Sequence, residues 1–191
     1  MLDRIRETLA SRERKEIFAP DRKESAILVP LYVKDRELYI LFTKRSFDVA
    51  HHKGQISFPG GARSEEDNNP QDTALRESWE EIGLEPSTVE IIGELDDVLT
   101  ATSNYLIHPY VGLIPHPYKF TANPNEILEL IEVPVKSLLD RMNYREEDAE
   151  DSWGGANVYF YKYKGKVIWG ATAIILKQLL DEIESICGAQ G

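Results

Sequence analysis

Short apolar runs separated by polar turns dominate the chain and predict a β-sheet with a few helices. The strand runs are rich in β-branched and aromatic residues, and a tight turn at Lys34-Asp35-Arg36 joins the first two. The predicted strands are residues 26–33, 37–43, 55–58, 89–95, 106–114, 127–133, 159–163 and 166–169. Helical spacing and helix-end signals predict helices near residues 2–9 and at 70–82, 134–139 and 171–186. We therefore expect an α/β fold in which helices pack on a mixed sheet.

The helix over residues 70–82 has the clearest boundaries in the sequence. Asn69 is a favourable N-cap, Pro70 fits the first helical position and Gly83 is a typical C-terminal stop. At 100° per residue, one side of this helix carries three carboxylates within an arc of about 100°. These are Glu77, Glu80 and Glu81. The residues expected to pack on the opposite side are Leu75, Ser78, Trp79 and Ile82.

The three glutamates destabilise the helix that carries them. Like charges at i,i+3 and i,i+4 each cost about 0.2–0.5 kcal/mol. Acidic groups in the last helical turn also oppose the helix dipole, at about 0.3–1 kcal/mol. A solvated acidic face is the alternative interpretation. A divalent cation would reverse the sign of both effects, and an oxygen-only ligand set suits Mg²⁺ or Mn²⁺.

Composition narrows the classes of function that the chain can perform. Its 191 residues are 42% hydrophobic and 29% charged, which suits one compact domain. The formal charge of −11 disfavours nucleic acid and anionic membranes as partners, so an anionic substrate needs a local device such as a metal ion. The longest apolar run, residues 169–176, is too short for a membrane span. The single cysteine, Cys187, excludes an intramolecular disulfide and favours a cytoplasmic location.

Basic and glycine residues upstream of the acidic helix are candidates for substrate contact. The basic residues are Lys44, Arg45, His52 and Lys53. They form a local positive cluster suited to phosphates, although ordinary charges at strand ends are the alternative. Gln55 is expected to orient substrate or a backbone group, or simply to face solvent. Gly60 and Gly61 allow close approach of the backbone to a ligand, or form a plain turn.

Two motifs in the sequence resemble those of a known superfamily. The pattern Gly61-x5-Asp67-x8-Arg76-Glu77-Ser78-Trp79-Glu80-Glu81-Ile82-Gly83 resembles the Nudix box, with Asp67 in place of the usual Glu and one extra residue before Arg76. Residues 41–46 and 52–61 are similar to the extended motif of the coenzyme A pyrophosphatase branch, and residues 123–134 and 167–173 resemble later landmarks of that branch. Ala50 stands where that branch tends to have arginine. The resemblance spans residues 26–180.

The resemblance implies a fold and a reaction. The fold is the Nudix α/β/α sandwich, a mixed sheet with helices on both sides. Since the N-terminal helix precedes the matching residues, we expect residues 1–20 to be a helical extension and residues 21–191 to be the Nudix domain. The reaction is metal-dependent hydrolysis of the pyrophosphate bond of coenzyme A or its derivatives, giving phosphopantetheine and adenosine 3′,5′-bisphosphate. Two alternatives stay open: hydrolysis of ADP-ribose, dinucleotides or other nucleoside diphosphate derivatives, and a noncatalytic nucleotide-binding regulator.

The resemblance also implies roles for individual residues. Glu77 and Glu81 are expected to bind Mg²⁺ or Mn²⁺, and Glu80 is expected to be a further ligand or the general base. Glu126 or Glu129 is an alternative base from outside the box, with a surface position as the competing interpretation. The expected substrate contacts are Arg45, His52, Lys53, Gln55, Gly60 and Gly61. The expected structural supports of the site are Arg76, Asp67 and Gly83. The expected partner is a small nucleotide substrate, with no nucleic acid or membrane, and a homodimer is left open.

Overall fold

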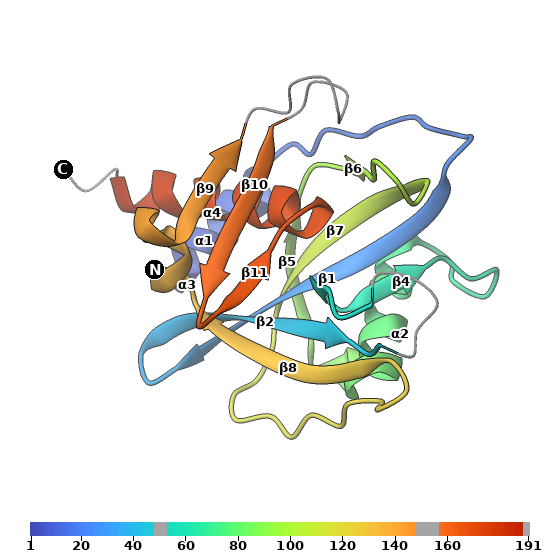
Figure 1. Ribbon diagram of the computed structural model, residues 1–191, viewed down its shortest axis with the longest axis horizontal. Coiled ribbons are helices and arrows are strands. Elements are labelled where there is room, and N and C mark those ends of the chain that lie inside the picture. The colour runs from blue at the N-terminus through green and yellow to red at the C-terminus, as the bar shows by residue number, and fades with distance from the viewer. Residues whose placement is uncertain (48–52, 148–156, 189–191) are drawn as a thin grey trace.

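A mixed sheet built around β1 (Lys23–Lys34) organises the structure (Figure 1). The computed structural model describes residues 1–47, 53–147 and 157–188. Within these residues the sheet has eight strands: β3, β2, β1, β7 and β5 lie in that order, with β8 beside β2, β4 beside β1 and β6 beside β7. β1 runs parallel to β7, and the other pairs are antiparallel. The other strands of the sheet are β2 (Glu37–Arg45), β3 (Ile56–Ser57), β4 (Gly60–Ala62), β5 (Glu90–Glu94), β6 (Val98–Leu99), β7 (Tyr105–Leu113) and β8 (Ile127–Pro134).

Helices cover both faces of this sheet, as the sequence predicts. On one face, α2 (Pro70–Ile82) packs Ala74 and Ile82 against Leu28 of β1. On the other, α1 (Leu2–Ser11) and α4 (Ala171–Gly188) share a core with Val29. β1 is therefore buried on both faces, which explains its nearly continuous apolar run. Figure 1 shows α2 on the side of the sheet opposite α1 and α4.

A smaller antiparallel sheet packs on α4 and corrects one prediction. It comprises β9 (Tyr144–Glu147), β10 (Val158–Tyr163) and β11 (Lys166–Ile168). The acidic run at residues 146–151 is by sequence typical of a solvated loop, but Glu146 and Glu147 belong to β9, while residues 148–151 lie outside the described residues. Both glutamates pair through their backbone with β10 and keep exposed side chains, so their charge does not oppose strand formation.

Three short helices complete the fold. They are α3 (Val135–Leu139) and the 3₁₀ turns η1 (Pro86–Thr88) and η2 (Arg141–Asn143). The N-terminal helix is confirmed as α1, whose Ile5 and Leu9 are buried in the main core. The boundary at residue 20 stays a prediction. Across the described part of the chain, no helix is both long and apolar enough to cross a membrane.

The ends of α2 follow the sequence signals. The Asn69 side chain accepts a hydrogen bond from the Asp72 N–H at 2.9 Å, and Pro70 is the first helical residue. Gly83 ends the helix in the left-handed region with φ of 67°, where glycine carries no Cβ penalty. The acidic helix thus begins and ends where predicted.

The packing side of α2 differs from the prediction. Ser78 and Ile82 are buried as expected, but Trp79 is 54% exposed and Glu81 is only 2% exposed. The helix meets the sheet along positions 74, 78, 81 and 82, so residue 79 projects away from it. One of the three carboxylates therefore points toward the protein interior.

Candidate catalytic site

The three glutamates of α2 lie in different surroundings. Their side chains are 2% exposed for Glu81, 17% for Glu77 and 46% for Glu80. A buried carboxylate is costly unless hydrogen bonds or a positive charge compensate for the lost water. The contacts of Glu81 and Glu77 are therefore central to the chemistry of the site.

Glu81 lies between the end of β2 and the start of β4. Arg45 donates to its Oε1 at 3.3 Å, and the Gly60 N–H donates to its Oε2 at 3.2 Å. Burial nevertheless raises the pKa of Glu81 to about 8, and the charges of Glu77 and Glu126 act in the same direction. The two existing contacts do not fully compensate for burial, so a further positive charge would stabilise the ionised form.

Glu77 packs directly against the backbone of Gly61. A Cβ atom on Gly61 would lie 2.4 Å from the carboxylate carbon of Glu77, so any larger residue would displace this side chain. Gly60 has φ of +147° and faces the Ala26 carbonyl. Burial raises the pKa of Glu77, although Arg76 donates to its Oε1 at 2.9 Å. Both glycines therefore shape the space beside the carboxylates.

Arg76 ties the loop before α2 to the acidic side of the helix. Its Nε and one terminal nitrogen donate to the two carboxylate oxygens of Asp67, each at 2.9 Å. The other terminal nitrogen donates to Glu77 and, at 3.1 Å, to Glu80. Asp67 also accepts from Thr73, and the Arg76 guanidinium holds the pKa of Asp67 well below its usual range. The shorter Asp side chain thus reaches Arg76 with both oxygens.

The remaining predicted substrate contacts are only partly gathered around the glutamates. Arg45 and Gly60 contact Glu81 directly. Lys53 is exposed in the turn before β3, and the Gln55 carbonyl accepts the Arg45 N–H at 3.0 Å. His52 lies outside the described residues, as does Ala50. The assigned roles stay predictions.

Of the two alternative bases, Glu126 is the one beside the acidic helix. Its charge contributes to the raised pKa of both Glu77 and Glu81. Glu129 instead pairs with Lys166 of β11 at 3.1 Å. The sequence does not show which of the two glutamates lies near the helix, because they are only three residues apart. Their different surroundings depend on a β-bulge between β2 and β8. Asn123 donates to Glu126 at 3.0 Å, and in the sequence only the resemblance of residues 123–134 points to it.

The donor set fits a hard divalent cation in its chemistry. Carboxylate oxygens are the ligands that Mg²⁺ and Mn²⁺ prefer, and the raised pKa values show negative charge that lacks compensation. Among residues 1–47, 53–147 and 157–188, however, no three acidic, histidine or cysteine side chains are already arranged around one point as metal ligands. Arg45 and Arg76 bind the three glutamates instead. A bound cation would therefore compete with these arginines for the same oxygens.

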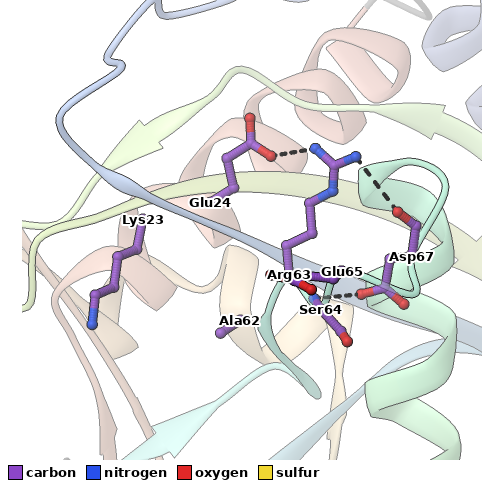
Figure 2. Close-up of a pocket in the computed structure, with 7 residues that line it drawn as sticks. All are labelled: Lys23, Glu24, Ala62, Arg63, Ser64, Glu65 and Asp67. Carbon is purple, nitrogen blue, oxygen red and sulfur yellow. Dashed lines mark hydrogen bonds and ion pairs between the residues drawn. The ribbon is translucent and has the colours of Figure 1, made fainter.

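A separate pocket of about 440 Å³ lies beside the loop that precedes α2. Figure 2 shows Arg63 between Glu24 and the loop around Asp67, with Lys23 extending away from them. Arg63 is paired with Glu24, and Glu65 adds a further negative charge to the lining. Because the lining has two basic and three acidic residues, it offers no strongly positive surface for a phosphate. The carboxylate side of α2 is the better candidate for the chemistry.

Comparison with known proteins identifies relatives along most of the chain. A model of the NUDIX domain matches residues 22–151. The uncharacterized Nudix hydrolase NudL of Photorhabdus laumondii is 34% identical over 167 residues, which cover 87% of this chain and 88% of that protein. The uncharacterized Nudix hydrolase NudL of Pectobacterium atrosepticum is 35% identical and covers 85% of this chain and 83% of its own.

Solved structures support the same fold. The NUDIX domain of Shewanella oneidensis NrtR, determined with ADP ribose, superposes with a TM-score of 0.56 at 14% identity, covering 89% of this chain and 94% of that one. At such low identity the likeness concerns the fold alone. The mixed sheet with a helix layer on each face is thus shared with structures of that type.

Proposed function

Because this chain belongs to the NUDIX domain family and is a Nudix hydrolase, we propose that it cleaves the pyrophosphate bond of coenzyme A or its derivatives with Mg²⁺ or Mn²⁺. The products would be phosphopantetheine and adenosine 3′,5′-bisphosphate. One observation carries the proposal: Arg45 and Gly60, from the motif that resembles the coenzyme A branch, both contact Glu81 of the box. The residues expected to recognise the substrate thus meet those expected to bind the metal.

The proposed roles follow from these contacts. Glu77, Glu80 and Glu81 would hold the cation, which neutralises phosphate charge and lowers the pKa of an attacking water when it is bound. Arg45 would contact a phosphate oxygen close to Glu81, since a guanidinium binds phosphate through paired donors. Water attacks one phosphorus, the bridging P–O bond breaks, and a carboxylate near the water takes its proton. Asp67 and Arg76 would keep the acidic side of α2 in position.

The proposal also covers the substrate class, the location and the oligomeric state. The nucleotide substrate is a small molecule, and the lone Cys187 of the described chain is a free thiol, in keeping with the predicted cytoplasmic location. A homodimer stays open.

The test is an assay with coenzyme A and millimolar Mn²⁺, with separation and identification of both products. We expect phosphopantetheine and adenosine 3′,5′-bisphosphate in equal amounts. ADP-ribose and a dinucleotide serve as competing substrates at matched concentrations. Much faster turnover of ADP-ribose than of coenzyme A, at comparable saturation, would refute the substrate assignment.

Variants of the box test the site itself. Glu80→Gln and Glu81→Gln should each lower turnover by orders of magnitude while leaving the circular dichroism spectrum unchanged. Glu129→Gln is the matched control, because it makes the same chemical change in a residue that pairs with Lys166 instead. Wild-type rates in both box variants would eliminate the proposed site.

A further inference from the structure

The loop between β7 and β8 is fastened to the C-terminal end of α2. The Asn123 N–H donates to the Glu81 carbonyl at 2.8 Å, and the Thr121 N–H donates to the Ile82 carbonyl at 2.9 Å. The last carbonyl groups of a helix have no partner within the helix, so these bonds satisfy two of them. The position of Asn123 is therefore fixed relative to the backbone of Glu81.

The side chain of Asn123 makes two different contacts. Its Nδ2 donates to Glu126 Oε1 at 3.0 Å, whereas its Oδ1 accepts the Asn125 N–H at 3.1 Å. The Asn123 carbonyl accepts the N–H groups of Glu126 and Ile127 at 3.0 and 2.8 Å. The oxygen of the Asn123 amide thus closes a local turn, and its nitrogen holds the Glu126 carboxylate.

Glu126 is also held from a second direction. Its carbonyl accepts the Ser46 N–H at 2.7 Å, directly beyond Arg45 at the end of β2. Because Asn123 is itself bonded to the Glu81 carbonyl, its amide holds the Glu126 carboxylate near the C-terminal end of α2. The charge of Glu126 also contributes to the raised pKa of both Glu77 and Glu81. The Asn123 amide holds this carboxylate through Oε1.

We propose that Asn123 is a positioning residue, which holds the Glu126 carboxylate toward the acidic side of α2 so that Glu126 can orient the attacking water. This inference rests on the proposed hydrolytic function of the site. It does not depend on which pyrophosphate is the natural substrate. An amide suits the task, because it donates to a carboxylate without changing its own charge near neutral pH.

The competing explanation is that Asn123 only shapes the turn. Asn123→Asp separates the two, because it keeps the acceptor oxygen that closes the turn and the backbone bond to Glu81 but removes the donor to Glu126. Asn125→Asp is the matched control: it makes the same chemical change two residues away, on a side chain that is exposed. A defect common to both variants would come from the added charge or a disturbed turn.

The experiment measures kcat and KM for these variants with coenzyme A, or with whichever pyrophosphate the wild type hydrolyses fastest. We expect Asn123→Asp to lower kcat at least tenfold with KM within twofold of wild type, and Asn125→Asp to stay within twofold in both. In a Glu126→Ala background, adding Asn123→Asp should change kcat by less than twofold, because the partner through which it acts is gone. Mn²⁺ affinity measured by calorimetry without substrate should stay within threefold in Asn123→Asp.

Several outcomes would overturn the proposal. They are an unchanged kcat in Asn123→Asp, an equal loss in Asn125→Asp, an equal loss in the Glu126→Ala background, or a loss of Mn²⁺ affinity that accounts for the fall in rate. Failure of coenzyme A as a substrate would refute only the substrate assignment, because the same comparison proceeds with another pyrophosphate.

Discussion

Two arginines flank the acidic helix, and their surroundings differ sharply. Arg76, on the side of the preceding loop, donates to both oxygens of Asp67, to two glutamates and to the Ala62 carbonyl at 2.9–3.2 Å. Among the described residues, the guanidinium of Arg45, on the side of β2, donates to Glu81 at 3.3 Å, and its buried Nε has no hydrogen-bond partner. The same residue type thus forms part of the framework on one side, while on the other side it has one buried donor without a partner within the described residues.

The difference reflects how each arginine reaches the helix. Asp67 and Arg76 belong to one loop-and-helix unit, so local geometry aligns them for a bidentate pair. Arg45 arrives from a strand 36 positions earlier in the chain, and only tertiary packing brings it to Glu81. We expect the first arginine to govern stability and the second to govern catalysis.

Arg76→Ala should produce the largest loss of stability. It leaves Asp67, whose side chain is 4% exposed, without its charged partner, and breaking a buried pair in this way costs about 3–5 kcal/mol. Urea unfolding followed by circular dichroism gives the free energy of unfolding. Arg63→Ala is the control, because its pair with Glu24 is more exposed and should cost less than about 1 kcal/mol. Equal losses in the two variants would contradict the framework role of Arg76.

Arg45→Ala should show the opposite pattern. We expect kcat/KM to fall by about 10- to 100-fold, equivalent to about 1.4–2.8 kcal/mol of transition-state stabilisation. The free energy of unfolding should change by less than about 1 kcal/mol, because Glu81, with a pKa of about 8, can take up a proton when its partner is removed. Steady-state kinetics and urea unfolding on the same preparation measure both, with Arg63→Ala again as the control. A loss of stability as large as that of Arg76→Ala would remove the distinction.

Acid should weaken the Arg76 side of the helix through Asp67. The folded pKa of Asp67 is lowered, so its contribution to stability is present above its unfolded pKa of about 3.9 and is lost as the pH falls below that value. Between pH 6 and pH 3 the wild type should lose about 1 kcal/mol more than Asp67→Asn. Urea midpoints at the two pH values test this. An identical acid dependence in the two proteins would show that Asp67 is not ionised in the pair.

The smallest expected effect concerns the outer side of α2. Trp79→Ala should lower the free energy of unfolding by less than about 1 kcal/mol, because the side chain is more than half exposed. Ile82→Ala, in the buried stripe of the same helix, should cost about 2–5 kcal/mol. Thermal and urea unfolding compare the two. Similar losses would place the helix in a different rotation from the one described.

Local signals predicted the acidic helix, but its orientation needed tertiary information. Asn69, Pro70 and Gly83 determine where the helix begins and ends through bonds and dihedral angles within a few residues. Which stripe meets the sheet depends on the sheet itself. A helical projection that places every charge toward solvent therefore predicted that Glu81 is exposed and Trp79 is buried. The structure shows the reverse.

The rest of the site shows the same division between local and distant information. Arg76 and Asp67 were expected to support the site, and they form an ion pair within one continuous motif. The separation of Glu126 from Glu129 was out of reach of the sequence, because it depends on the bulge where β8 pairs with β2. The strand β9 was missed since exposed acidic residues in an edge strand look like those of a loop.

The parallel pairing of β1 with β7 governs how the chain must fold. Lys23 pairs with Tyr105 and Leu31 with Leu113. One edge of β1 is therefore covered only when β7, about eighty positions later in the chain, pairs with it. The loop between such distant segments must close before their contacts can form, and this slows the folding of mixed sheets. During synthesis, an apolar strand that ends at residue 34 stays without this partner until residue 113 has left the ribosome. The early nascent chain is therefore the stage at which this protein most needs protection from aggregation.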